Sequence, residues 1–137
     1  MMTAKFSLLM AEGAIVMELR GHVGWRELGN DPVCAGASTL GMTVAQCVKD
    51  MEDAGKLQKR ANITMGSGRL KVVAKPQPEY FHEALHLFWI GQRGMNLLEE
   101  AYPGHVALKP FEASPGDEEG NTQESGDDSI NTKESST

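Results

Sequence analysis

The chain has 137 residues, of which 40% are hydrophobic, and a formal net charge of −6. This is enough for one domain with a modest core. The charge is unevenly placed, because residues 113–137 hold seven acids and one base, whereas residues 1–112 hold equal numbers of both. A neutral body gives no sign of the basic surface that nucleic-acid binding requires, and no apolar run approaches the length of a membrane span. We therefore expect neither nucleic acid nor a membrane among the partners.

Composition divides the chain into two parts. Residues 113–137 are mostly Gly, Ser, Asn, Thr, Asp and Glu, and such a segment cannot bury enough apolar surface to offset the entropy lost on ordering. We predict a folded domain over 1–112 and a disordered acidic tail over 113–137. The first residues lack the apolar block of a signal peptide. Cys34 and Cys47 would lie roughly 20 Å apart on one helix, beyond disulfide reach, so we expect a cytoplasmic protein.

The apolar residues follow two periods along the chain. A period of two predicts strands at 3–10 and 14–20, a second hairpin over 61–75, and a short strand around Val106 and Leu108. A helical period predicts helices at about 32–54 and 79–101. The order ββαββαβ is typical of a single-domain α/β layered sandwich, with two helices packed on a mixed or antiparallel sheet.

The start of the first predicted helix carries the clearest chemical signal. Asp31 is a good N-cap, and Pro32 suits the first helical position because it has no N–H to leave unpaired. Cys34 then falls in the first turn, where the helix dipole and the unpaired amides favour a thiolate. These amides could also stabilise a substrate oxyanion. Cys47 lies in the middle of the same helix on its apolar stripe, where we expect only packing.

Residues 21–31 supply partners for a cysteine nucleophile. His22 follows Gly21 at the end of a predicted strand and could accept the proton of Cys34. Asp31 could orient His22 in addition to capping the helix. Trp25 lies in a glycine-containing loop, 23–30, that could cover a substrate, and Gly21 lets a substrate approach the backbone closely. A structural role for His22 and a purely capping role for Asp31 are the alternatives.

A zinc peptidase is a less favoured alternative. The sequence His82-Glu83-Ala84-Leu85-His86 matches the H-E-x-x-H pattern, which places two imidazoles on one face of a helix with a glutamate as base. The pattern needs a third ligand, and Glu99, Glu100 and His105 match no recognised motif for one. We therefore expect no metal and no cofactor.

Three segments together resemble the ribosomal-processing cysteine protease family, Prp. They are Gly21-His22, the stretch from Gly29 through Asp31-Pro32-Val33-Cys34 to Ser38, and Glu99-Glu100-Ala101-Tyr102-Pro103. The resemblance runs in order across residues 1–112. It implies a Cys34 nucleophile with His22 as base and Asp31 as the assisting acid. It also implies a homodimer that removes an N-terminal extension from a large-subunit ribosomal protein. A non-catalytic ribosome- or phage-associated binding protein with the same fold is the principal alternative.

Overall fold

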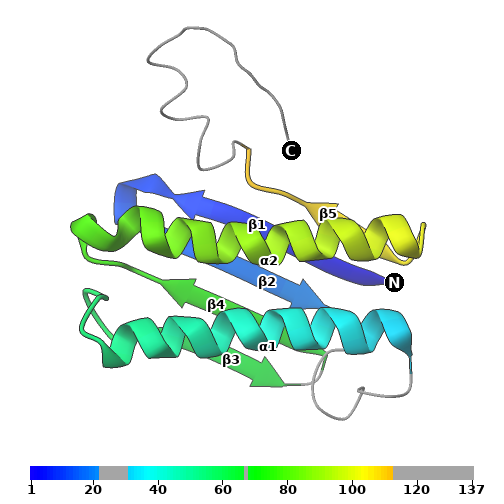
Figure 1. Cartoon of the computed structure of the whole chain (residues 1–137), viewed down its shortest axis with the longest axis horizontal. Coiled ribbons are helices and arrows are strands. Elements are labelled where there is room, and N and C mark those ends of the chain that lie inside the picture. Colours follow the sequence, from blue (N-terminus) through cyan, green and yellow to red (C-terminus); the bar gives the residue numbers. More distant parts are fainter. Residues whose placement is uncertain (22–30, 67, 113–137) are drawn as a thin grey trace, which may run out of the picture.

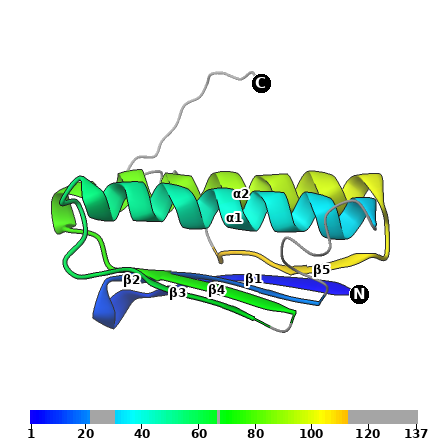
Figure 2. The same ribbon diagram turned by 90° about the horizontal axis from the view of Figure 1, so that it is seen from below.

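A computed structural model describes residues 1–21, 31–66 and 68–112 of the chain. Two long helices cover one face of a five-stranded sheet, and the other face is open (Figures 1 and 2). The strands are β1 Met2–Leu9, β2 Ala14–Arg20, β3 Asn62–Gly66, β4 Arg69–Ala74 and β5 Val106–Lys109. The long helices are α1 Pro32–Asp53 and α2 Phe81–Ala101, and short 3-10 turns occur at η1 Met10–Glu12 and η3 Pro78–Tyr80. The predicted α/β sandwich with the order ββαββαβ is confirmed.

The sheet is mixed, as predicted. Its strand order is β3-β4-β2-β1-β5. The two hairpins pair antiparallel, β2 pairs antiparallel with β4, and β5 pairs parallel with β1. The chain crosses from the β1–β2 hairpin to the far hairpin through α1, and returns through α2 to the edge beside β1. Each long connection is therefore a helix on the same face of the sheet.

The core lies between the sheet and the helices. Alternate residues of each strand point toward the helices and are buried, as the period of two predicts. The largest fully buried side chains include Ile15, Met17, Leu19, Leu70 and Val72 from the sheet, and Val48, Phe88 and Met95 from the helices. The opposite face of the sheet carries the polar residues of the same strands, so it contributes little to this core.

Glycines set the distances at which α1 packs on its neighbours. A Cβ atom built on Gly41 would lie 2.5 Å from Leu19 Cδ1, so α1 approaches the sheet more closely than any larger residue would permit. A Cβ built on Gly94 of α2 would lie 2.6 Å from Cδ2 of Leu40 in α1. Because overpacking a core costs roughly 1–3 kcal/mol, glycine at these positions fixes the position of α1 and of the residues at its start.

The ends of the helices follow local signals. After α1, Gly55 has a φ of +75°, and the N–H of Lys56 donates to the carbonyl of Met51 at 2.9 Å. This is the left-handed ending that glycine favours. The second helix begins at Phe81 rather than near residue 79, because Pro78, Glu79 and Tyr80 form the turn η3. No helix among the described residues is long and apolar enough to cross a membrane.

Candidate active site

A side-chain cap holds the first turn of α1. Asp31 has an extended backbone, and its Oδ1 accepts hydrogen bonds from the N–H of Val33 at 2.8 Å and from the N–H of Cys34 at 3.2 Å. Pro32 occupies the first helical position. The predicted cap is thus present, and it holds Cys34 in the first turn of the helix, where the helix dipole favours a negatively charged sulfur.

Cys34 lines a pocket at this end of the molecule, where the start of α1 lies near the N-terminus of the chain (Figure 1). The pocket has a volume of about 250 Å³ and is lined by Met1, Met2, Gly21, Asp31, Val33, Cys34 and His105. Only 8% of the Cys34 surface is exposed, and neither cysteine of the chain forms a disulfide. The structure therefore brings Cys34, Asp31 and Gly21 together around one pocket.

Gly21 is the part of the pocket with the tightest backbone requirement. Its φ is +129°, a value that side-chain-bearing residues rarely adopt. A Cβ on Gly21 would also lie 3.2 Å from the carbonyl oxygen of Met1 and 3.2 Å from Cα of Met2. Its N–H donates to the carbonyl of Gly68 at 2.9 Å, which anchors the end of β2 to the second hairpin. The backbone entering the His22 segment is thereby fixed beside the pocket.

Two of the predicted site residues, His22 and Trp25, lie outside the described residues, as does the rest of the predicted loop 23–30. Asp31 is described, and both of its capping bonds use Oδ1. Capping therefore does not use Oδ2, so the two roles expected of Asp31 need not compete for one oxygen.

The amides at the start of α1 are already engaged. The N–H groups of Val33 and Cys34 donate to Asp31 Oδ1, and the N–H of Ala35 donates to the Asp31 carbonyl at 2.8 Å. The sequence suggested these amides as donors to a substrate oxyanion. A substrate oxygen would have to share the longer bond at Cys34 or displace the Asp31 side chain, so the cap limits this role.

His105 is a pocket residue that the sequence did not place near Cys34. It follows Gly104 in the turn between α2 and β5, and it lines the Cys34 pocket. Its Nδ1 lies 3.3 Å from the carbonyl oxygen of Tyr102 and 3.2 Å from that of Pro103. A carbonyl oxygen only accepts, so the neutral ring carries its hydrogen on Nδ1, and Nε2 is the acceptor. The parallel pairing of β5 with β1 carries this turn to the pocket, and that pairing is not visible in local sequence.

Cys47 occupies a different setting from the one expected. It is partly exposed rather than buried in the core, and it lines a groove of about 380 Å³ between α1 and α2. The groove is also lined by Met51, Leu87 and Ile90, and by the charged or polar Asp50, Lys56, Glu83 and His86. Cys47 therefore lies at the outer surface of the helix layer, 13 residues after Cys34 on the same helix.

The H-E-x-x-H segment does not form a metal centre with other described residues. No group of three or more potential metal ligands occurs in the described ranges. Glu83, which would act as base, is paired with Lys56, whose Nζ lies 3.0 Å from Oε2 and 3.2 Å from Oε1. The ring of His86 packs edge-on against Trp89. These contacts fit a polar side of a packed helix.

Comparisons with known proteins agree with the fold and identify the family of the chain. The family model described as cysteine protease Prp matches residues 1–107. Two crystal structures of the essential ribosomal processing protease Prp from S. aureus, one with a substrate peptide and one with a covalently linked product peptide, superpose with a TM-score of 0.56. They are 21% identical to the chain and cover 82% of it and 100% of their own length.

A third structure, SMU.848 from Streptococcus mutans, is 25% identical, with a TM-score of 0.56, and covers 81% of this chain and 93% of its own. No curated protein sequence matches the chain. The solved structures share the two-layer α/β fold, and the family match spans every described strand and helix but the last two residues of β5. The chain therefore belongs to the Prp family of cysteine proteases.

Proposed function

We propose that this protease removes the N-terminal extension of a large-subunit ribosomal protein, with Cys34 as nucleophile and His22 as base. The observation that carries the proposal is the shared pocket of Cys34 and Gly21, because Gly21 is the chain neighbour of His22. The S. aureus relative, whose structures contain a substrate peptide and a covalently linked product peptide, supports a peptide substrate. That relative is a ribosomal processing protease, and this role supports a cytoplasmic location for the present chain.

The first half of the reaction forms an acyl-enzyme. His22 takes the proton of the Cys34 thiol, and the sulfur attacks the scissile carbonyl carbon. The tetrahedral intermediate collapses as the C–N bond breaks, and the imidazolium gives its proton to the leaving amine. The capped first turn of α1 places the positive end of the helix dipole at the sulfur anion before it attacks.

The second half returns the enzyme to its starting state. A water molecule gives a proton to His22 and its oxygen attacks the thioester carbonyl, after which the C–S bond breaks and Cys34 regains a proton from the imidazolium. Asp31 Oδ2, which the cap does not use, orients the imidazole and stabilises its charge. We assign substrate binding to Trp25 and to Gly21, which lines the Cys34 pocket, and the reaction as written uses no cofactor.

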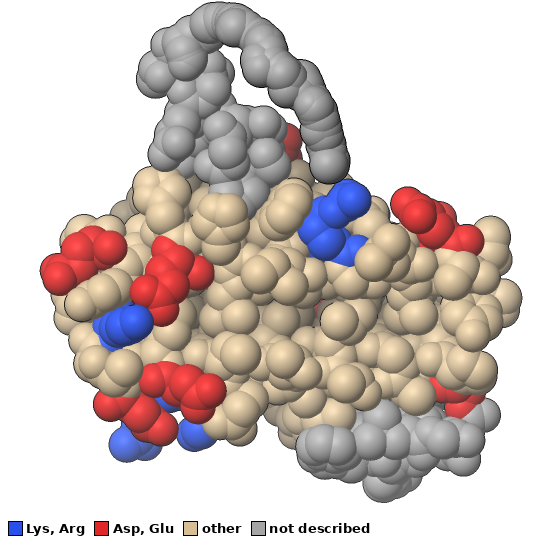
Figure 3. All heavy atoms as spheres, viewed as in Figure 1, with Lys and Arg blue, Asp and Glu red and all other residues tan. Residues whose placement is uncertain are grey.

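The outer face of the helix layer suits a homodimer. Ile90 and Leu97 lie seven residues apart on α2, hence on one face, and are 63% and 62% exposed. Ile90 also borders the 380 Å³ groove between the helices. Figure 3 shows that most of this face is uncharged, with a basic patch within it and charged side chains, mostly acidic, toward its ends. Replacing both residues with glutamate should shift the molar mass measured by light scattering from dimer to monomer.

The activity is tested by incubating the protein with a large-subunit ribosomal protein that carries its N-terminal extension. We expect Cys34→Ala to abolish cleavage and Cys47→Ala, a matched substitution on the same helix, to leave it unchanged. Cleavage that persists in Cys34→Ala would overturn the assignment of the nucleophile. Binding of the extension without any cleavage by the unaltered protein would favour the non-catalytic alternative.

A further inference from the structure

The fold separates charges that cancel in the sequence. The five strands carry five basic residues and one acidic residue, whereas α1 and α2 together carry two basic and six acidic residues. The strand residues are Lys5, Glu18, Arg20, Arg69, Lys71 and Lys109. The helix residues are Lys49, Asp50, Glu52, Asp53, Glu83, Arg93, Glu99 and Glu100. Residues 1–112 carry equal numbers of acidic and basic residues, but the sheet layer is therefore positive and the helix layer negative.

The basic residues share the open face of the sheet. They alternate along their strands with residues buried under the helices, so they point to the opposite side. Strand register aligns Lys71 with Glu18, Glu18 with Lys5, and Lys5 with Lys109, which makes one row across four neighbouring strands. Arg20 and Arg69 are aligned in an adjacent row. Three strand spacings of about 4.8 Å make the first row roughly 14 Å long.

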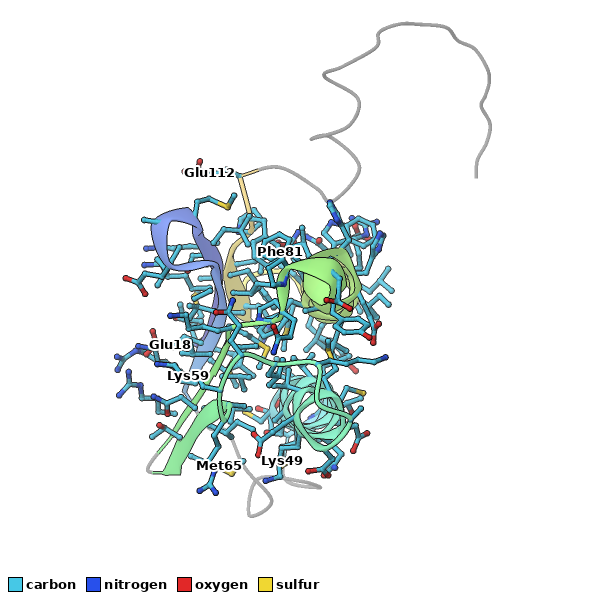
Figure 4. All side chains as sticks on the ribbon, turned by 90° about the vertical axis from the view of Figure 1, so that its left-hand side faces the viewer. Glu18, Lys49, Lys59, Met65, Phe81 and Glu112 are labelled. Carbon is cyan, nitrogen blue, oxygen red and sulfur yellow. The ribbon has the colours of Figure 1, made fainter. Side chains whose placement is uncertain are left out.

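Glu18 pairs with two of the five basic residues of this face, Arg20 and Arg69, and so positions them while cancelling only one positive charge. Its Oε2 lies 2.9 Å from Arg20 Nη2 and 2.8 Å from Arg69 Nε. Burial raises the pKa of Glu18, but the hydrogen bond from Arg69 and the nearby charges of Arg20, Arg69 and Lys71 outweigh it, so the pKa lies below its ordinary value. One ionised carboxylate thus holds two guanidinium groups on the open side of the sheet (Figure 4). Lys5, Lys71 and Lys109 form none of the ion pairs found among the described residues.

The remaining side chains of this face select for phosphate rather than for a protein partner. Protein interfaces depend on aromatic and large apolar anchors. None of the described strand residues on this face is aromatic, and its large apolar side chains are limited to Leu9, Val16 and Val73, of which Val16 is buried. Hydroxyl side chains at Thr3, Ser7 and Thr64 lie beside the cations. Cations and hydroxyls without stacking groups fit contacts to a nucleic-acid backbone, which are independent of sequence.

We propose that the open face of the sheet binds the phosphate backbone of RNA. The choice of RNA among polyanions rests on the proposed function, because the substrate proposed above is a protein of the ribosome, which is built largely of RNA. The basic face itself does not depend on that function. It adjoins the candidate site along the chain, since Arg20 ends β2 on this face and the next residue, Gly21, lines the Cys34 pocket. RNA held there would place a ribosome-bound substrate beside the thiol.

The experiment measures binding of the full chain, carrying Cys34→Ala, to a fluorescent 20-nucleotide poly(U) RNA by anisotropy between 50 and 200 mM KCl. We expect Lys5→Gln/Lys71→Gln to weaken binding about tenfold at the lower salt concentration and to reduce the slope of log K against log salt by about 1.4. The matched control is Lys49→Gln/Arg93→Gln, which removes the same charge from the helix layer and should leave binding unchanged. Glu18→Gln should tighten binding.

Each contrary outcome is decisive. Absence of RNA binding at 50 mM KCl, or an equal loss in both double variants, overturns the proposal. Competition by poly-glutamate or by single-stranded DNA as effectively as by RNA would leave a polyanion surface but overturn the assignment to RNA. Thermal melts confirm that each variant is folded. Because the Cys34→Ala chain is used, failure of the protease assignment does not affect this result, and failure of RNA binding does not affect the protease assay.

Discussion

The two cysteines of α1 show how position on one helix separates chemistry from packing. Cys34 lies in a first turn capped by Asp31 and lines a pocket with Gly21 and His105. Cys47 lies 13 residues later, in a groove beside Met51 and Ile90. Cys34 is the more buried of the two, so exposure alone would select Cys47 as the reactive thiol. The dipole, the cap and the neighbouring residues favour Cys34 instead.

Among substitutions that keep both cysteines, removal of the proposed base should have the largest effect. In His22→Ala we expect the cleavage rate to fall by about 10²–10⁴-fold, because general acid–base catalysis contributes on that order. Alkylation of Cys34 at neutral pH should also become slower. His105→Ala is the control, since His105 lines the same pocket but is not the assigned base. A greater loss of kcat in His105→Ala than in His22→Ala would contradict the assignment.

Gly21, which follows β2, should be more sensitive to substitution than Gly55, which follows α1. Gly21 and Gly55 have φ values of +129° and +75°, so alanine is strained at both. Only at Gly21 would the new Cβ meet backbone atoms, those of Met1 and Met2, at 3.2 Å. We expect Gly21→Ala to lower the free energy of unfolding by more than the roughly 1 kcal/mol expected for Gly55→Ala and to slow cleavage. Equal losses in urea unfolding would show that the close approach at Gly21 has no consequence.

Two substitutions at Asp31 separate its capping role from its charge. Asp31→Ala removes the cap and should cost about 1 kcal/mol of unfolding free energy. Asp31→Asn retains an oxygen that can accept from Val33 and Cys34, so its melting temperature should stay close to that of the unaltered protein. Both should slow cleavage if the charge orients His22. Normal cleavage by Asp31→Asn would limit Asp31 to capping.

The smallest effect concerns Glu18, which lines neither the pocket of Cys34 nor the groove of Cys47. Its pKa is lowered in the folded state from an ordinary value of 4.5, so its contribution to stability is fully present above that pH and is lost as the pH falls through the folded-state pKa. For a partly exposed ion pair we expect less than about 1 kcal/mol. Urea unfolding of Glu18→Gln should therefore differ from the unaltered protein at pH 7, and the difference should vanish as the pH falls through the lowered pKa of Glu18. A difference that grows in acid would contradict this sign.

Local sequence signals predicted most of the secondary structure and the capped helix start that carries Cys34, but not the other elements that line its pocket. The alternation in the strands, the Asp31-Pro32 cap and Gly55 predicted element boundaries to within a few residues, because each acts through its immediate neighbours. Nothing local predicted that β5 pairs parallel with β1, and so His105 was not expected in the Cys34 pocket. Charge counting along the chain likewise averaged over the two layers and missed the basic face of the sheet.

Cys47 illustrates the same limit within a helix. A stripe with spacings of three and four identifies the side that packs, but it does not say which residues lie at the edge of the stripe. The second helix, α2, covers only part of α1, and so Cys47 lines the groove between the two helices instead of joining the core. A control that relies on Cys47 must therefore measure its alkylation directly and not assume that it is inaccessible.

The most direct test of the difference between the cysteines is the pH dependence of alkylation of both thiols in the same protein. Iodoacetamide is added over pH 5–10, and the modification of Cys34 and Cys47 is followed by mass spectrometry of their peptides. We predict that Cys34 keeps reacting well below the ordinary thiol value of about 8.5, and Cys47 serves as the internal reference for the reagent. A midpoint near 8.5 for Cys34 would contradict the account of Cys34 as an activated nucleophile.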